Sequence, residues 1–122
     1  MRHIISILVD NEPGVLARIA GLFTARGFNI ESLCVAETEK PSLSRLTLVT
    51  SGDEWIIDQI VKRFENMINV IKVEDLSGED SLERELIIAR ISTNQKTRSE
   101  VLRVADIFRA NVVDVGPKSY AL

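Results

Sequence analysis

The 122-residue sequence contains one cysteine and one histidine, too few for the chemistries that need several of either. A single cysteine excludes a disulfide within the chain and suits a reducing cytosol. One histidine and one cysteine cannot supply the four ligands of a zinc site. No glycine-rich phosphate loop of the Walker or dinucleotide-binding type occurs either. The sequence therefore predicts no disulfide framework, no metal ion and no cofactor bound by this chain.

Long apolar runs and an excess of basic charge are also missing. No segment approaches the ~20 apolar residues that cross a bilayer, and the first residues lack the pattern of a signal peptide. The formal net charge is -3 with mixed signs, whereas nucleic-acid-binding domains usually carry a basic stripe. The 45% hydrophobic content is that of a globular protein. We expect a cytoplasmic protein that binds neither nucleic acid nor membranes.

Groups that could carry catalysis are scarce. His3 lies near the start of an apolar segment with no evident acidic partner, so we expect a solvated histidine at a strand end. Cys34 lies inside an apolar segment, where a buried thiol behaves as a small hydrophobic group. A nucleophile needs a base nearby, and no spacing in the sequence provides one. We therefore expect no catalytic residue, and a small ferredoxin-like enzyme is disfavoured.

Hydrophobic periodicity divides the first part of the chain into six elements. Alternation with period two predicts strands, and spacing of three to four predicts amphipathic helices. The elements are a strand at 2–9, a helix from Val15 to its left-handed cap at Gly27, strands at 28–37 and 44–50, a helix at 53–66 that Asp53 caps, and a strand at 70–73. This β-α-β-β-α-β order predicts an α+β, ferredoxin-like domain, in which both helices cover one face of an antiparallel four-stranded sheet.

The first strand carries apolar residues on both of its faces. Because the two helices can cover only one face of the sheet, the other face retains Ile4, Leu8 and Leu33 or Val35. An apolar sheet face of this size is usually an interaction surface. We expect two copies of the chain to pair through this face or through adjacent strand edges.

The composition becomes polar after Val73 and apolar again near residue 84. We therefore place the first domain at residues 1–76, a linker at 77–83 and a second unit at 84–122. The second unit is expected to hold a strand at 85–91, a helix at about 98–109, a strand at 111–115 and the beginning of another strand after Pro117. It repeats the opening β-α-β pattern, but so small a sheet buries little core. We expect an incomplete unit, the truncated start of a C-terminal α+β domain.

The most informative segment is the turn Asp10-Asn11-Glu12-Pro13-Gly14-Val15-Leu16, where a strand gives way to a helix. A helix N-terminus exposes backbone N–H groups and carries about half a positive charge, so it favours a carboxylate or a phosphate. Gly14 has no Cβ and lets a ligand approach the backbone closely. A purely structural helix start also often has Pro or Gly here, so the turn alone leaves both interpretations open.

Two amide side chains favour ligand binding. Asn29 opens the second strand between apolar neighbours, and Asn11 lies in the turn; each amide offers donors and an acceptor. Backbone N–H groups for a carboxylate, amides for an ammonium, and Leu16 or Ile30 for an aliphatic tail suit a free amino acid. A ligand of about eight heavy atoms gains at most ~1.5 kcal/mol per atom, so micromolar to millimolar affinity is expected.

The segments around these residues resemble the small regulatory subunits of acetolactate synthase, which belong to the ACT-domain family of amino-acid-binding modules. In the first domain the resemblance rests on the segments at residues 11–19, 26–33 and 43–47. In the second unit, 83–86 and 105–115 fit the same family. The resemblance covers essentially the whole chain.

The resemblance implies a noncatalytic regulatory subunit. In this family two N-terminal ACT domains dimerise and bind valine at their interface, where the Gly14 turn of one subunit faces the Asn29 strand of its mate. By matching position, the carboxylate end would be held by Asn11, Gly14, Val15 and Leu16, and the other side by Asn29 and Ile30. The subunit would activate the catalytic (large) subunit of acetolactate synthase and confer feedback inhibition by valine.

Thiamine diphosphate, FAD and Mg²⁺ are then expected on the catalytic partner. An ACT-type sensor of another amino acid, regulating a different enzyme, is the alternative; the second unit favours the acetolactate synthase family. Valine and isoleucine differ by one methylene, which is worth only ~1–3 kcal/mol, so we expect cross-reactivity among branched-chain amino acids.

Overall fold

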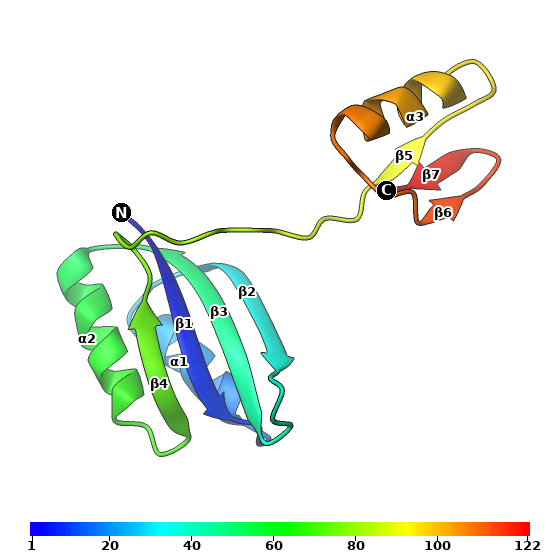
Figure 1. Cartoon of the computed structure of the whole chain (residues 1–122). Coiled ribbons are helices and arrows are strands. Elements are labelled where there is room, and N and C mark those ends of the chain that lie inside the picture. The colour runs from blue at the N-terminus through cyan, green and yellow to red at the C-terminus, as the bar shows by residue number, and fades with distance from the viewer. The chain divides into compact units, whose positions relative to one another are not determined.

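The computed structural model describes residues 1–122, which form two compact units, Met1–Ser81 and Leu82–Leu122. The first unit contains β1 (Arg2–Asp10), α1 (Val15–Ala25), β2 (Ile30–Glu37), β3 (Leu43–Ser51), α2 (Glu54–Glu65) and β4 (Val70–Asp75) (Figure 1). The sequence predicts every one of these elements to within two residues at each end. The β-α-β-β-α-β order is confirmed.

The four strands form one antiparallel sheet in the order β2-β3-β1-β4. β1 is central, and its register pairs Ile5 with Leu48 and Ile7 with Leu46. Both helices lie on the same side of this sheet, as Figure 1 shows. β2 and β4 are the edge strands, so each keeps one row of backbone groups unpaired within the chain.

The core lies between the sheet and the two helices, and it follows the predicted periodicity. Odd-numbered positions of β1 face the helices, and each helix contributes a stripe spaced by three and four residues. Phe23 of α1 and Phe64 of α2 lie with ring centroids 5.5 Å apart, which joins the helices over the sheet. The buried core consists of Ile5, Ile7, Val9, Val15, Ile19, Phe23, Leu46, Leu48, Ile57, Ile60, Phe64 and Val70.

The sequence predicted the wrong side of the sheet for the apolar side chains of β2. Leu33 pairs with Leu48 and therefore lies on the helix side of the sheet, and Val35 does so by the same rule. Both remain 40% exposed because β2 is an edge strand. Cys34 pairs with Thr47 on the opposite face and is exposed, so the prediction of a buried thiol is wrong.

The helix-free face of the sheet is also more polar than predicted. Arg45 reaches across it and donates a hydrogen bond from Nη1 to Ser6 Oγ at 2.8 Å. Lys72 and Glu74 of β4 form an ion pair on the same face. The expected apolar face therefore reduces to a few aliphatic side chains between polar groups, and it offers little surface for pairing. The exposed large apolar residues of this sheet lie on its edge strands instead, Leu33 and Val35 on β2 and Ile71 on β4.

His3 is buried, not solvated. It occupies a core-facing position of β1 and is only 2% exposed. Its Nδ1 lies 3.0 Å from Oδ2 of Asp75, an acidic partner 72 residues later in the chain. The pairing of β1 with β4 brings the two together, and the sequence spacing gives no sign of this pairing.

The hydrogen bonds to the Asp75 carboxylate make the stability of the first unit depend on pH. Burial alone would raise the pKa of its carboxyl, but hydrogen bonds from the side chain and backbone of Ser77 and from His3 outweigh it and lower the pKa below 3.8. A carboxylate with a lower pKa in the folded state stabilises the fold above the unfolded pKa and loses that effect as the pH falls through the folded pKa.

We therefore expect Asp75→Asn to lower the free energy of unfolding at pH 7, with a smaller deficit near pH 3. Urea unfolding at the two pH values measures this difference. Asp80→Asn, at an exposed position five residues later, should change neither value. A deficit of equal size at both pH values would contradict the assignment.

The second unit contains β5 (Arg90–Ser92), α3 (Arg98–Ile107), β6 (Asp114–Val115) and β7 (Ser119–Ala121). The predicted strand at 85–91 was too long at its start, because residues 82–89 adopt no regular structure. The strand predicted at 111–115 is only two residues long, because residues 111–113 adopt no regular structure either. The helix and the final strand are where the periodicity placed them.

The second unit repeats the topology of the first. Its sheet has the order β5-β7-β6 with antiparallel neighbours, as β1-β3-β2 has in the first unit. α3 then corresponds to α1, since each connects the first two strands of its sheet. Residues 82–122 contain no counterpart of α2 or β4, and α3 consequently buries only Ala105.

Candidate functional site

The turn at the start of α1 is built as the sequence predicts. Gly14 is the N-cap residue, with φ 86° and ψ -11°, a left-handed conformation that glycine adopts without strain. A Cβ added here would meet no atom within 4 Å, so open space lies beside the backbone. The turn therefore needs glycine for its backbone conformation and leaves room for a ligand.

The N-terminus of α1 lacks the usual capping groups. No side chain of the cap residue accepts a hydrogen bond, and the first turn contains no acidic residue. α2 differs, because Asp53 accepts a hydrogen bond from the Trp55 amide at 2.9 Å and Glu54 adds a negative charge. The positive end of α1 is therefore not compensated by its own cap, which suits an anionic group from elsewhere.

Asn11 joins this turn to the end of β2. Its Nδ2 donates to Glu37 Oε1 at 3.1 Å and to the Pro41 carbonyl at 3.0 Å. Its backbone amide also donates to the Ser42 carbonyl at 2.8 Å. The Gly14 turn is therefore fixed against the β2–β3 hairpin, next to the last residue of β2.

These contacts also determine which way the Asn11 amide points. A carboxylate and a carbonyl only accept hydrogen bonds, so the amide nitrogen must face both of them. Both amide hydrogens are then used within the chain, and Oδ1 is the group left for a ligand. Asn11 can accept a hydrogen bond from a bound molecule, but its side chain cannot donate one to a carboxylate.

The other predicted site residues, Asn29 and Ile30, lie at the far end of α1. Asn29 follows the helix cap, and its carbonyl accepts a hydrogen bond from Thr50 Oγ1 at 2.7 Å, at the opposite end of the sheet from Gly14. An 11-residue helix is about 16 Å long. The structure therefore groups Asn11, Gly14, Val15 and Leu16, and it separates them from Asn29 and Ile30 within one chain.

The predicted site residues differ in how far their side chains are exposed to solvent. Val15 is 2% exposed and belongs to the core, and its backbone amide donates a long hydrogen bond of 3.5 Å to the Glu12 carbonyl. Leu16 is 43% exposed beside the turn. Ile30 is partly buried against the core, whereas the neighbouring Asn29 is exposed. Glu37 was missed by the sequence analysis, because its contact with Asn11 depends on how the hairpin folds back.

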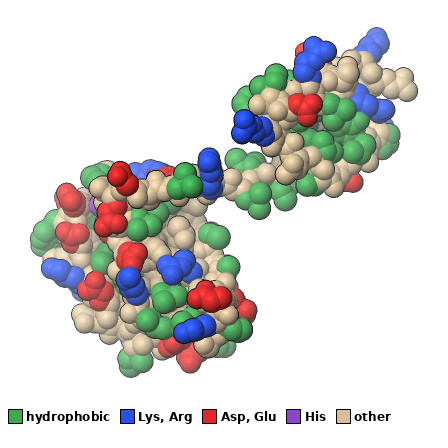
Figure 2. All heavy atoms as spheres, in the orientation of Figure 1, with side chains coloured by type: hydrophobic (Ala, Val, Ile, Leu, Met, Phe, Trp, Pro, Cys, Tyr) green, Lys and Arg blue, Asp and Glu red, His purple; other side chains and the backbone are tan.

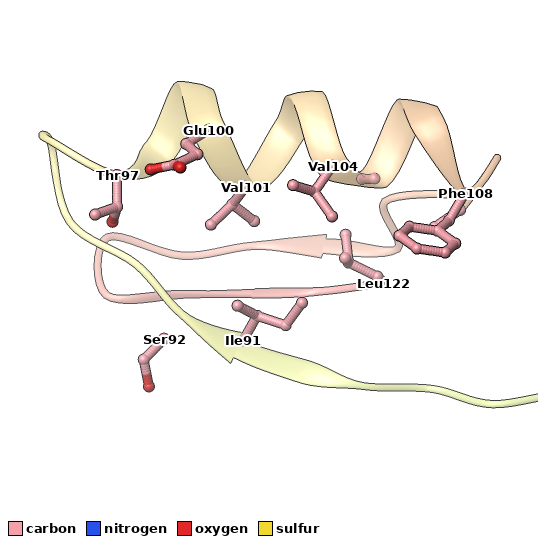
Figure 3. A pocket seen from close by; sticks show the side chains of 10 residues that line it. Ile91, Ser92, Thr97, Glu100, Val101, Val104, Phe108 and Leu122 are labelled. Carbon is pink, nitrogen blue, oxygen red and sulfur yellow. The ribbon is translucent and has the colours of Figure 1, made fainter.

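A separate apolar cavity of about 520 Å³ lies in the second unit, between α3 and the sheet (Figure 3). Figure 3 shows Val101 and Val104 of α3, and Phe108 just after its end, above Ile91 and Leu122, with Glu100 and Thr97 at the other end of the helix. Hydrophobic side chains also cover much of the visible surface of this unit in Figure 2. None of the residues that line this cavity belongs to the predicted site.

Neither a metal-binding cluster nor a membrane-spanning helix is found in the structure. No group of three or more His, Cys, Asp or Glu side chains is arranged to hold a metal ion. The longest helix has 12 residues, and none of the helices is long and apolar enough to cross a membrane.

The split β-α-β-β-α-β sheet, with a glycine turn after its first strand, is the arrangement found in ACT domains. Among solved structures, the ACT domain from GTP pyrophosphokinase of Chlorobium tepidum shares this fold, with a TM-score of 0.56 and 16% identity over 70% of this chain and 97% of that chain. Residues 5–72 match the family model described as the AHAS small subunit-like ACT domain, and residues 84–122 match the one described as the small subunit of acetolactate synthase. The chain belongs to the acetolactate synthase small-subunit family.

Similar proteins agree with this family over both units. The acetolactate synthase small subunit of Haemophilus influenzae is 47% identical over 122 residues, which is all of this chain and 75% of that protein. The acetolactate synthase isozyme 3 small subunit of Escherichia coli is 43% identical over the same share of each. The crystal structure of the acetolactate synthase small subunit from Thermotoga maritima superimposes with a TM-score of 0.85 at 37% identity, over 99% of this chain and 76% of that one.

Proposed function

We propose that this chain is the regulatory small subunit of acetolactate synthase and that its ACT domains dimerise and bind valine at their interface. Bound valine would transmit feedback inhibition to the catalytic subunit, and the small subunit itself would raise the activity of that partner. The chain would take no direct part in the reaction, so thiamine diphosphate, FAD and Mg²⁺ belong on the catalytic subunit. Family membership supports the partnership, and the turn before α1 supports the ligand site.

The main support for a site shared by two copies is the distance between its two halves, the Gly14 turn and Asn29 just before β2. Gly14 and Asn29 lie beyond opposite ends of α1, which is about 16 Å long, and a free amino acid is much shorter than this. One chain therefore cannot offer both groups to one valine. A second copy is needed to supply the missing half.

The edge strand β2 provides a suitable means of pairing. Its outer edge is unpaired, and Leu33 and Val35 are 40% exposed along it. When two β2 strands pair antiparallel about a two-fold axis, the first residue of one strand lies beside the last residue of the other. Asn29 and Ile30 of one copy then approach Glu37 of its partner, which is hydrogen-bonded to Asn11 of the Gly14 turn.

The chemistry of the turn fits both charged ends of an α-amino acid. The uncapped backbone amides after Gly14 favour the carboxylate, and Oδ1 of Asn11 is a suitable acceptor for the ammonium. This assignment changes the expected role of Asn11 from a carboxylate donor to an ammonium acceptor. Leu16 of one copy and Ile30 of the other would contact the aliphatic tail.

Titration calorimetry tests the ligand. Valine should bind with micromolar to millimolar affinity, leucine and isoleucine within about tenfold to a hundredfold of it, and serine and phenylalanine more weakly. An absence of heat with valine would overturn the proposal. Binding of phenylalanine in preference to valine would favour an ACT-type sensor of a different amino acid.

Leu33→Lys tests the dimer. A charge placed on the apolar edge of β2 would have to be desolvated when two copies pair. We expect the dimer dissociation constant to rise about a hundredfold, and valine affinity to fall with it, because the site needs both copies. Analytical ultracentrifugation and calorimetry on the same sample measure the two effects.

Ile71→Lys is the matched control, because Ile71 is a 54% exposed aliphatic residue on the other edge strand, β4. This variant should remain dimeric and bind valine normally. A Leu33→Lys protein that remained dimeric at wild-type affinity would place the interface elsewhere.

A further inference from the structure

The cluster around His3 extends beyond the end of β4 into the connection that follows. The His3 side chain is buried, and its Nδ1 lies 3.0 Å from Asp75 Oδ2 and 3.2 Å from Ser77 Oγ. Ser77 was placed in the linker by the sequence, yet it accepts a hydrogen bond from the Ile4 amide at 3.3 Å. The first residue of the predicted linker is therefore bonded to the first strand of the sheet.

The backbone between these side chains closes into a turn. The Ser77 amide donates to Asp75 Oδ1 at 3.0 Å, and Asp75 thus holds both His3 and Ser77 through its two carboxylate oxygens. The Leu76 amide donates to the Ile4 carbonyl at 2.8 Å, and the Glu79 amide donates to the Leu76 carbonyl at 3.3 Å. Gly78, with φ 83°, allows the reversal between them.

The ring orientation of His3 follows from its surroundings. Nε2 is buried and has no hydrogen-bond partner, so a hydrogen there would be left unsatisfied. Nδ1 faces a carboxylate oxygen, which accepts a hydrogen bond only. The hydrogen therefore belongs on Nδ1, where it is shared with Asp75 in a part-buried, charge-assisted bond.

We propose that His3, Asp75 and Ser77 form a latch that holds residues 76–79 on the first sheet, beyond the last residue of β4. With the latch closed, Leu76 and Ser77 stay hydrogen-bonded to Ile4 and continue the path of β4 along β1. With it open, the strand ends at Asp75, which pairs with Ile5 in the sheet, and residues 76–79 leave β1. The latch is a conformational device of the first unit, and its existence does not depend on the ligand or on the catalytic partner.

Hydrogen exchange of the full chain, followed residue by residue by NMR, tests the latch. In Asp75→Ala and in Ser77→Ala the Leu76 and Glu79 amides should exchange about tenfold faster or more, because each variant removes latch hydrogen bonds. These two amides are informative because their acceptors are backbone carbonyls that both variants keep. Asp80→Ala and Ser81→Ala, the same residue types at exposed positions further along, should leave both rates unchanged.

The ring nitrogens of His3 provide a second readout. The ¹⁵N shifts of the wild-type ring should report the hydrogen on Nδ1, and Asp75→Ala should move the tautomer toward Nε2–H. Wild-type exchange rates at Leu76 and Glu79 in both latch variants would overturn the proposal. In Ser77→Ala, which keeps the Asp75 carboxylate, an equal acceleration of the central amides of Ile5 and Leu48 would also overturn it, because this would show a loss of overall stability and not the release of a local latch.

Discussion

Gly14→Asp should lower the affinity for valine about a hundredfold while leaving the ACT domain folded. Asp tolerates a left-handed backbone better than most residues, and the space beside Gly14 is open, so the expected cost to the fold is about 1 kcal/mol. The new carboxylate would cap α1 itself and so occupy the place of the ligand's carboxylate. Loss of charge-assisted hydrogen bonds worth about 3 kcal/mol corresponds to an affinity about a hundredfold lower.

Calorimetry with valine and thermal unfolding of the same sample measure the two effects. Gly78→Asp is the matched control, since Gly78 has φ 83° and equally open surroundings but lies outside the site. It should cost similar stability and leave valine affinity unchanged. Gly14→Ala separates strain from charge, and its effect on affinity should be smaller than that of the aspartate. Normal valine binding by Gly14→Asp would remove the turn from the site.

Mixing Gly14→Asp chains with Asn29→His chains should restore the valine affinity that neither variant has alone. In a two-fold dimer with a shared site, each site takes Gly14 from one copy and Asn29 from the other. A dimer of the two variants then has one site with both substitutions and one site with neither. The intact site should bind valine with wild-type affinity, since it contains only unaltered residues.

The experiment separates a shared site from a site within one chain. The two variants are mixed, dissociated and reassociated, and the number of valine molecules bound per dimer is measured by calorimetry. Each variant reassociated with itself is the control and should bind valine only weakly. If the mixed sample binds no more valine than these controls, although ultracentrifugation shows mixed dimers, the site is not built from Gly14 and Asn29 of different copies.

Local sequence rules predicted the secondary structure of the first unit well, because each of its elements carries its own signals. Asp53 caps α2, Gly27 ends α1 with φ 76°, and the apolar spacing marks the buried stripes. The same rules were less reliable at 85–91, where the apolar residues of an expected strand form no regular structure. A strand needs a neighbour, and a single run of residues does not show whether a neighbour is present.

The faces of β2 and the partner of His3 could not be predicted in this way. Leu33 and Val35 were assigned to the wrong side of the sheet because their side depends on the register of β2 against β3. His3 was expected in solvent because its acidic partner lies 72 residues away. The candidate site was affected similarly, since Glu37 is 26 residues from the Asn11 that it orients.

The sequence by itself determined the order of elements and the glycine turn before α1, because spacing, caps and turn residues act over a few neighbouring positions. Only the tertiary structure decided that the two halves of the proposed ligand site lie at opposite ends of one helix, that the Asn11 amide presents its oxygen, and that β2 is an edge strand with exposed apolar residues. These features follow from strand pairing and hydrogen bonds between residues far apart in the chain, and such contacts form only once the register of the whole sheet is fixed.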